Sequence, residues 1–341
     1  MTRTREYAAE TRSLRGSGQG LGPCSRLPGC LLRFTFLVLL VVVCATTISH
    51  ASPGGAAGAF LQLGGGALAG GMGGAVAAAT EDIYSLYWNP AGLDHLTGTE
   101  LVASYRFMSL DRRCFFSGIA QPLEPDGGYA LGWLFAGTEV ARRDINGAIT
   151  GEMLDSENAF YFAFARGVPL PVPASLGLTA KYLYQTLADQ TAKGLGFDLG
   201  LQLLLPGNLR MGWVIKNIGM RLSWKTNLWE RETASEDGIP RSLVVGLAHR
   251  SLSDRLLLAA DVSKSRDTKT DVRLGSEWVV HPMVSVRCGA SHFLESEMRA
   301  LSAGLDVRTF RAPGFFRFGY AYMTDPIGAG SSHVVSLMMG F

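Results

Sequence analysis

Apolar and polar residues alternate along most of the chain beyond residue 100, in segments of about ten residues. In residues 195–203 every second residue is Leu or Phe, and the residues between them are Gly, Asp or Gln. Residues 271–280, 301–308 and 316–322 repeat the pattern, and their glycines and charged residues share one face. A period of two residues predicts β-strands with one apolar face.

About fourteen such segments follow one another, an even number that suits a closed single-chain antiparallel barrel. They span residues 100–109, 113–121, 128–136, 157–168, 174–187, 192–204, 209–218, 241–249, 256–264, 270–280, 284–293, 298–310, 315–323 and 332–341. The long connections, residues 137–156 and 219–240, follow odd-numbered segments, and several short ones follow even-numbered segments. Long outer loops and short periplasmic turns show this asymmetry in outer-membrane barrels.

A soluble β-sandwich would show the same local alternation, with its apolar face turned inward. The segments here stay close to ten residues and carry little charge on the apolar face, where Arg or Lys at mid-bilayer would cost about 2–4 kcal/mol. The chain also ends in Phe341 behind alternating apolar residues, which is similar to the signal that outer-membrane assembly machinery recognises. We therefore predict an all-β fold, a transmembrane antiparallel β-barrel of about fourteen strands over residues 100–341.

The composition agrees with this fold class and excludes nucleic-acid binding. Charged residues make up 18% of the chain, 42 residues are Gly, and the formal net charge is only +2. No basic face is therefore available for nucleic acid. Of five cysteines, only Cys114 and Cys288 lie beyond the N-terminal region, so we expect small wall residues and no disulfide framework.

The N-terminus has the three parts of a secretory signal. A basic region ends at Arg33, residues 34–43 are apolar, and residues 49–51 form a small-x-small cleavage site. We predict a signal peptide over residues 1–51 with a long basic region, and hence export to the bacterial outer membrane. Cys44 offers a lipoprotein alternative, but the valines before it are too large for that cleavage site.

Residues 51–79 are uncharged and rich in Gly and Ala. Each Gly costs about 1 kcal/mol relative to Ala inside a helix, which disfavours a membrane helix. The spacing of Gly66, Gly70 and Gly74 leaves an inner-membrane anchor as an alternative. We assign residues 52–99 to a Gly-rich N-terminal plug segment.

Residues 58–63 (GAFLQL), 71–76 (GMGGAV) and 81–93 (EDIYSLYWNPAGL) resemble the opening of PorV/PorQ-type outer-membrane proteins. That family in turn resembles the FadL-like transporters of hydrophobic compounds. The resemblance implies a fourteen-stranded barrel whose N-terminal segment lies in the lumen as a plug. It indicates a ligand or plug motif of Gly71, Gly73, Gly74, Asp82, Trp88, Asn89 and Pro90. The motif either holds the plug in shape, because Asn and Pro favour a turn, or flanks a ligand path.

Two further groups of residues are candidates for functional contacts. Trp224 and Trp229, in the connection 219–240, suit a lipid rim or a partner. The charges on the predicted lumen face either pair and fix the wall or tune which solutes pass. These are Asp198, Asp261, Asp271, Arg273, Glu277, Arg287, Asp306, Arg308 and Arg317.

No motif predicts catalysis, a metal site or a cofactor. The six histidines, at positions 50, 95, 249, 281, 292 and 333, show no metal-ligand spacing. We expect a non-enzymatic protein that contacts outer-membrane lipid. The nearer resemblance implies a docking accessory for exported proteins or the secretion machinery. The wider one implies uptake of long-chain fatty acids or other hydrophobic small molecules. A structural barrel without cargo is the third hypothesis.

Overall fold

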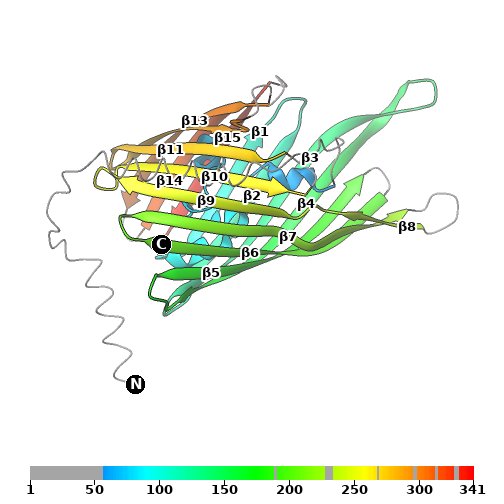
Figure 1. Cartoon of the computed structure of the whole chain (residues 1–341). Helices are drawn as coiled ribbons and strands as arrows, with labels where there is room; N and C mark the ends of the chain where they lie inside the picture. The colour runs from blue at the N-terminus through cyan, green and yellow to red at the C-terminus, as the bar shows by residue number, and fades with distance from the viewer. Residues whose placement is uncertain are drawn as a thin grey trace. The chain divides into compact units, whose positions relative to one another are not determined.

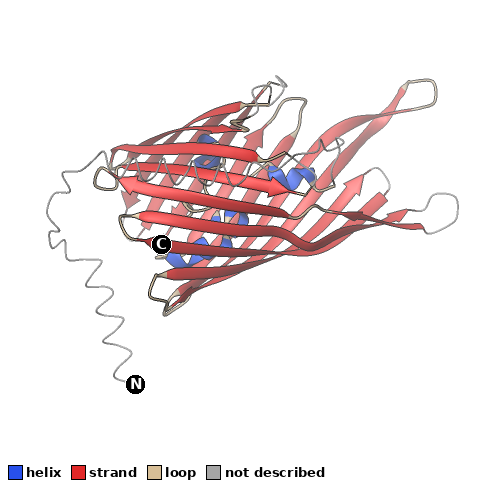
Figure 2. Ribbon diagram, viewed as in Figure 1, coloured by secondary structure: helices blue, strands red, loops and turns tan. Residues whose placement is uncertain are grey.

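The computed structural model describes residues 57–187, 190–226, 233–266, 269–294, 298–311, 314–325 and 330–341. The predicted signal peptide and Trp229 lie outside these residues. Fifteen strands make up most of the described chain (Figures 1 and 2). They are β1 Glu100–Phe107, β2 Arg113–Pro122, β3 Gly127–Arg143, β4 Ile149–Val168, β5 Ala174–Leu187, β6 Gln190–Leu205, β7 Leu209–Thr226, β8 Thr233–Gly238, β9 Ser242–Ser251, β10 Leu256–Ser265, β11 Asp271–His281, β12 Val284–Ser291, β13 Ala300–Arg311, β14 Gly314–Thr324 and β15 Ser331–Gly340.

The strands form one closed antiparallel barrel. Apart from β8, each strand pairs with the next one along the chain: β7 pairs with β9, and β1 pairs with β15 to close the ring. β8 pairs only with the last residues of β7, outside the ring. The wall therefore consists of β1 to β7 and β9 to β15, fourteen strands in all, which confirms the predicted fold class.

The apolar face of most wall strands points outward, as predicted for lipid contact. In β6, Leu195 and Leu199 are 58% and 48% exposed, whereas Asp198 and Gln202 between and beyond them are 2% and 3% exposed. The same alternation recurs in β5 and β15. Polar and small residues therefore face the lumen, and the belt of exposed Leu and Phe faces the hydrocarbon of the bilayer.

One end of the barrel carries long hairpins and the other carries short turns. The connection predicted over residues 137–156 is mostly strand, because β3 and β4 continue as a hairpin to a turn at Asp144. Gly147 has φ 84° in this turn, a left-handed backbone conformation that glycine adopts without strain. The connection 219–240 likewise contains the end of β7 and all of β8. We call this the hairpin end and the opposite one the short-turn end.

Residues 57–99, which we call the lumen segment, lie inside the ring of strands (Figure 2). The segment holds four short helices, η1 Ala59–Gln62, α3 Ala67–Gly71, α4 Ser85–Trp88 and η2 Pro90–His95. No helix in the described part of the chain is long and apolar enough to cross a bilayer. The Gly-rich stretch instead forms tight turns, with positive φ at Gly64, Gly66, Gly73 and Gly74.

Candidate functional site

The lumen segment runs from the hairpin end to the short-turn end. Near its start, the carbonyl of Leu63 accepts a hydrogen bond from Arg106, close to the outer end of β1. Near its finish, the carbonyl of Thr99 accepts from the backbone N–H of Phe341, and β1 begins at the next residue. Any path along the lumen therefore passes this segment.

Asn89 and Pro90 are buried between the segment and the wall. The Asn89 amide donates to the carbonyls of Ala77 (2.6 Å) and Leu201 (3.3 Å), and its side-chain oxygen accepts from the N–H of Ala91 (3.2 Å). These bonds cap η2 and tie two turns of the segment to β6. Because Asn89 is fully buried, its contacts support the structural interpretation of the motif.

Two wall glycines make room for this contact. A Cβ at Gly200 of β6 would overlap the Asn89 side chain and lie 2.8 Å from Pro90 Cδ. A Cβ at Gly177 of β5 would overlap the backbone of Pro90 and Ala91. Glycines that the sequence shows only as small lumen-side residues therefore form the seat of the lumen segment.

Trp88, unlike its neighbours Asn89 and Pro90, is only partly buried. It is partly exposed although it lies inside the barrel, and its indole N–H donates to the carbonyl of Gly65 (3.1 Å). Lys216 of β7 donates to the Tyr87 carbonyl (3.0 Å), and its ammonium lies 5.1 Å from the centre of the Trp88 ring. Trp88 therefore keeps an accessible face, whereas Asn89 and Pro90 are enclosed between the segment and the wall.

The three motif glycines lie against the opposite wall. A Cβ at Gly71 would lie 3.1 Å from the Gly304 backbone, and one at Gly73 would lie 2.7 Å from the Ala290 backbone. Gly74, with φ 77°, lies beside Arg273. They allow close approach between the segment and β11 to β13, and nothing in this geometry gives them a ligand to hold.

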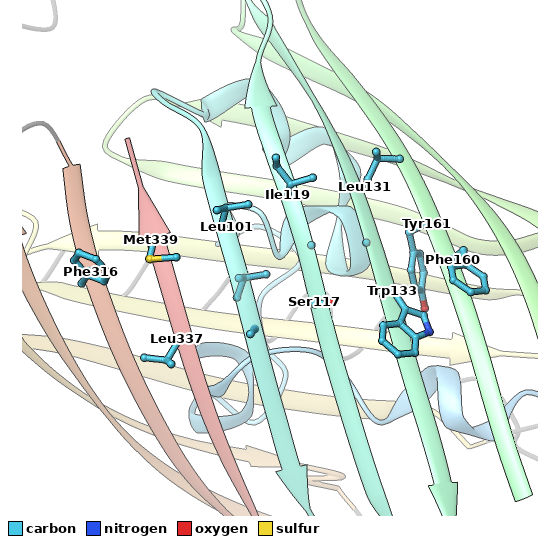
Figure 3. A pocket seen from close by; sticks show the side chains of 14 residues that line it. Leu101, Ser117, Ile119, Leu131, Trp133, Phe160, Tyr161, Phe316, Leu337 and Met339 are labelled. Carbon is cyan, nitrogen blue, oxygen red and sulfur yellow. The ribbon is translucent and has the colours of Figure 1, made fainter.

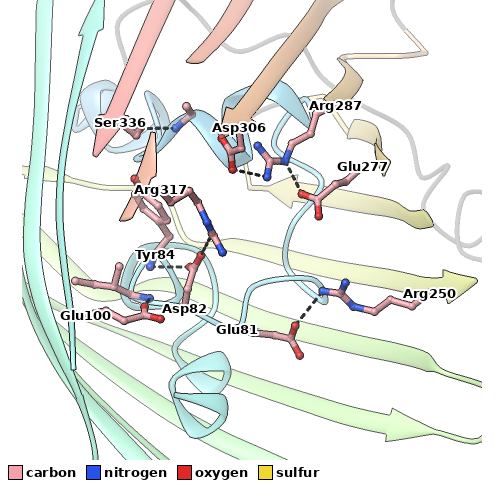
Figure 4. A network of polar contacts seen from close by, with 12 residues as sticks. Glu81, Asp82, Tyr84, Glu100, Arg250, Glu277, Arg287, Asp306, Arg317 and Ser336 are labelled. Carbon is pink, nitrogen blue, oxygen red and sulfur yellow. Dashed lines mark hydrogen bonds and ion pairs between the residues drawn. The ribbon is translucent and has the colours of Figure 1, made fainter. Parts of the chain in front are cut away.

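Asp82 and its neighbour Glu81 form ion pairs with different parts of the wall (Figure 4). Glu81 contacts Arg210 of β7 and Arg250 of β9, the latter at 3.0 Å. Asp82 contacts Arg317 of β14 at 3.4 Å and accepts a hydrogen bond from the N–H of Tyr84. Sequence analysis selected Asp82 but missed Glu81, whose partners are more than a hundred residues away.

The pKa values of these two carboxyls move in opposite directions. Burial acts to raise the pKa of Glu81, but the guanidinium groups of Arg210 and Arg250 outweigh it and the pKa lies below its usual value. For Asp82, burial outweighs the attraction of Arg317 and the pKa lies above its usual value. Relative to an ordinary carboxyl of its own type, the charged form is therefore favoured at Glu81 and disfavoured at Asp82.

Most of the predicted lumen charges form ion pairs within the wall. Arg287 bridges Glu277 (2.5 Å) and Asp306 (2.6 Å), which joins β11, β12 and β13. Asp271 pairs with Arg273 at 2.6 Å. These contacts support the interpretation that lumen charges fix the wall.

Four further charged side chains also lie on the lumen face. Asp198 pairs with Lys181 at 2.6 Å, and both side chains are 3% exposed. The guanidinium of Arg308 lies 4.1 Å above the Phe315 ring. Lys181 and Lys216 were not selected from the sequence, although the alternation of their strands places both on the lumen face.

Trp224 lies in the hairpin that β7 and β8 form, and its indole donates to Asp237 at 2.8 Å. It lines a cavity of about 490 Å³ together with Asp155, Glu157 and Glu236. Nowhere in the described ranges do three or more His, Cys, Asp or Glu side chains gather in a way that could hold a metal ion. This cavity opens next to Ala57, at the start of the lumen segment as described.

An apolar groove of about 750 Å³ lies on the outer face of β1 to β4, β14 and β15 (Figure 3). Leu101, Leu131, Trp133 and Phe160 border it, and small residues such as Ser117 leave it open. Sequence analysis missed this groove, because its residues come from both ends of the barrel chain and meet only after closure.

The wall behind the groove is thin. On its lumen side stand Gly118 and Gly132, and the segment's Ile83 and Leu86 lie against them. A Cβ at Gly118 would lie 3.4 Å from Ile83, and one at Gly132 would lie 3.1 Å from Leu86. Apolar side chains of the lumen segment and the apolar groove are therefore separated by little more than strand backbone.

A closed fourteen-stranded barrel with an internal N-terminal segment defines the class of this protein as an outer-membrane-type β-barrel. Its fold is similar to that of solved hydrocarbon channels. The toluene transporter TodX of P. putida aligns with TM-score 0.55 and 14% identity over 82% of this chain and 99% of its own. The monoaromatic hydrocarbon channel CymD aligns with TM-score 0.54 and 16% identity over 82% and 97%.

A FadL homologue of Pseudomonas aeruginosa aligns with TM-score 0.53 and 10% identity over 81% and 97%. No protein-family model and no curated protein sequence matches the chain. The likeness is therefore one of fold, and it agrees with the wider, FadL-like resemblance found in the sequence. PorV/PorQ membership has no counterpart among these three neighbours.

Proposed function

We propose that this protein is an outer-membrane channel that admits hydrophobic small molecules. The observation that carries the proposal is the apolar groove on the lipid side of the wall, directly behind which the apolar face of the lumen segment lies. An apolar ligand would meet a low-polarity surface on either side of the wall there, as small-molecule sites generally provide. The fold shared with toluene and hydrocarbon channels supports the same class of cargo.

The route is proposed to begin at the hairpin end. The partly exposed Trp88 offers a first aromatic contact inside the lumen. The route would then pass Ile83, which precedes α4, and Leu86, which lies in α4. These two side chains contact the wall at Gly118 and Gly132. The ion-paired charges stand on other strands and hold the remaining wall together.

Filling the groove tests this route. The double substitution Ala103→Phe and Ser117→Phe places two rings into the groove without adding charge to the lipid face. We expect uptake of radiolabelled toluene by intact host cells to fall toward the level of cells with empty vector. The matched control is Ala303→Phe, which adds a ring to another outward position, on β13, away from the groove. Equal uptake by the groove variant and the wild type would refute the route.

Docking of exported proteins is the second candidate function, because the β3–β4 and β7–β8 hairpins project beyond the ring. Ile145, at the tip of the first hairpin, is fully exposed and could contact a partner. The PorV/PorQ-like opening of the chain implies this role. It ranks below the channel because the fold neighbours are hydrocarbon channels.

A further inference from the structure

Glu81 and Asp82 are consecutive residues whose side chains reach two separate arcs of the barrel wall. Glu81 pairs with β7 and β9, Asp82 pairs with β14, and β10 to β13 lie between these arcs in the ring. One dipeptide therefore ties the lumen segment across the barrel (Figure 4).

Both attachments lie at the short-turn end. Arg210 is the second residue of β7, Arg250 is the last but one of β9, and Arg317 is near the start of β14. The side chains of Glu81 and Asp82 are 29% and 14% exposed, so Asp82 is the more buried of the two. The next residue, Ile83, donates its N–H to the Glu100 side chain at the start of β1, which adds a third attachment of the segment at this end.

We propose that Glu81 and Asp82 form a two-sided ionic latch that keeps the short-turn end of the lumen closed, and that release of the Asp82 side opens it. This inference rests on the proposed channel function only for the reason why a latch would be useful: a channel for apolar molecules should not let ions leak through. Each side of the latch resists displacement of the segment toward the other side.

The two sides differ in strength. Glu81 has two guanidinium partners, whereas Asp82 has one at the longer distance of 3.4 Å. Around Asp82 stand charges from several strands, namely Arg317, Arg287, Arg308 and Glu100, besides Glu81. Asp82 is thus the side that opens first.

Ion conductance of the full processed protein in planar lipid bilayers tests the latch. We expect the wild type to be closed most of the time at pH 7.5, and Asp82→Asn to raise the open probability about 5- to 30-fold, as loss of one stabilising contact does for a two-state equilibrium. Arg317→Gln should have the same effect, and the double variant should add little to either single one. Exchange of the charges, Asp82→Arg with Arg317→Asp, should restore closure.

The pH dependence has a definite sign. The Asp82 pair is present when the carboxylate is charged, and the raised pKa means that it is lost as pH falls, earlier than for an ordinary Asp. Wild-type open probability should therefore rise on acidification, and Asp82→Asn should be open throughout. Glu81 has a lowered pKa, so its ion pairs should persist to lower pH than those of an ordinary Glu.

Asp94→Asn is the matched control. Asp94 lies in the same segment and accepts a hydrogen bond from Ser175, but it takes no part in the latch. It should stay closed. The latch is wrong if Asp82→Asn and Arg317→Gln remain as closed as the wild type, or if Asp94→Asn opens equally. Ion conductance does not depend on the cargo. If the wild type took up no toluene while the conductance of the variants followed the latch predictions, the result would count against the channel function alone.

Discussion

Gly200→Leu should unseat the lumen segment and destabilise the protein. The new side chain would occupy the space of the Asn89 amide and the Pro90 ring, neither of which can move without breaking the bonds to Ala77 and Leu201. Overpacking of this kind costs about 1–3 kcal/mol, and the lost hydrogen bonds of a buried amide add about 1–3 kcal/mol. We expect a lower urea midpoint of unfolding in liposomes and a leaky barrel in planar bilayers.

Gly151→Leu is the matched control for this substitution. Gly151 lies in the β3–β4 hairpin, where an added Cβ meets nothing within 4 Å. It should leave both the urea midpoint and the conductance unchanged. If Gly200→Leu behaved in the same way, the contact between Asn89 and the wall would not be what seats the segment.

Arg287→Met should cost more than any other single substitution of a lumen charge. Its guanidinium is 3% exposed and satisfies two carboxylates, so removal leaves Glu277 and Asp306 uncompensated on the inner wall. Breaking a buried pair by removing one partner costs about 3–5 kcal/mol. The free energy of unfolding in liposomes, followed by tryptophan fluorescence in urea, should fall by this amount.

Two comparisons make the Arg287 result specific. Adding Glu277→Gln and Asp306→Asn to Arg287→Met should recover most of the loss, because no buried charge then remains unpaired. Arg221→Met, which breaks the exposed pair with Glu236, should cost less than about 1 kcal/mol. A similar loss for Arg221→Met and Arg287→Met would show that burial does not govern these pairs.

The wall was predictable because successive residues of a strand in a membrane barrel face lipid and lumen in turn, so apolar and polar residues alternate in the sequence. Leu195 and Asp198 differ in exposure as their places in the alternation require. The hairpins were harder to predict than the wall. Beyond the bilayer a strand needs no apolar face, so the alternation of apolar and polar residues is lost in residues 137–156 although β3 and β4 continue there. β8 was not predicted as a strand for the same reason.

The lumen segment could be assigned from resemblance, but its contacts could not be predicted. Asn89 meets Leu201, and Asp82 meets Arg317, across more than a hundred residues of chain. No local period encodes such distances. The apolar groove cannot be predicted from the sequence either, because Ser117 and Leu337 come to line the same groove only when β1 and β15 close the ring.

Native mass spectrometry of the protein, extracted gently from its own outer membrane, tests the channel account most directly. The account predicts that a small apolar molecule remains bound to the wild type, and that the Ala103→Phe and Ser117→Phe variant loses it. A stoichiometric adduct of an exported protein, kept by the groove-filled variant, would contradict the channel account and favour docking.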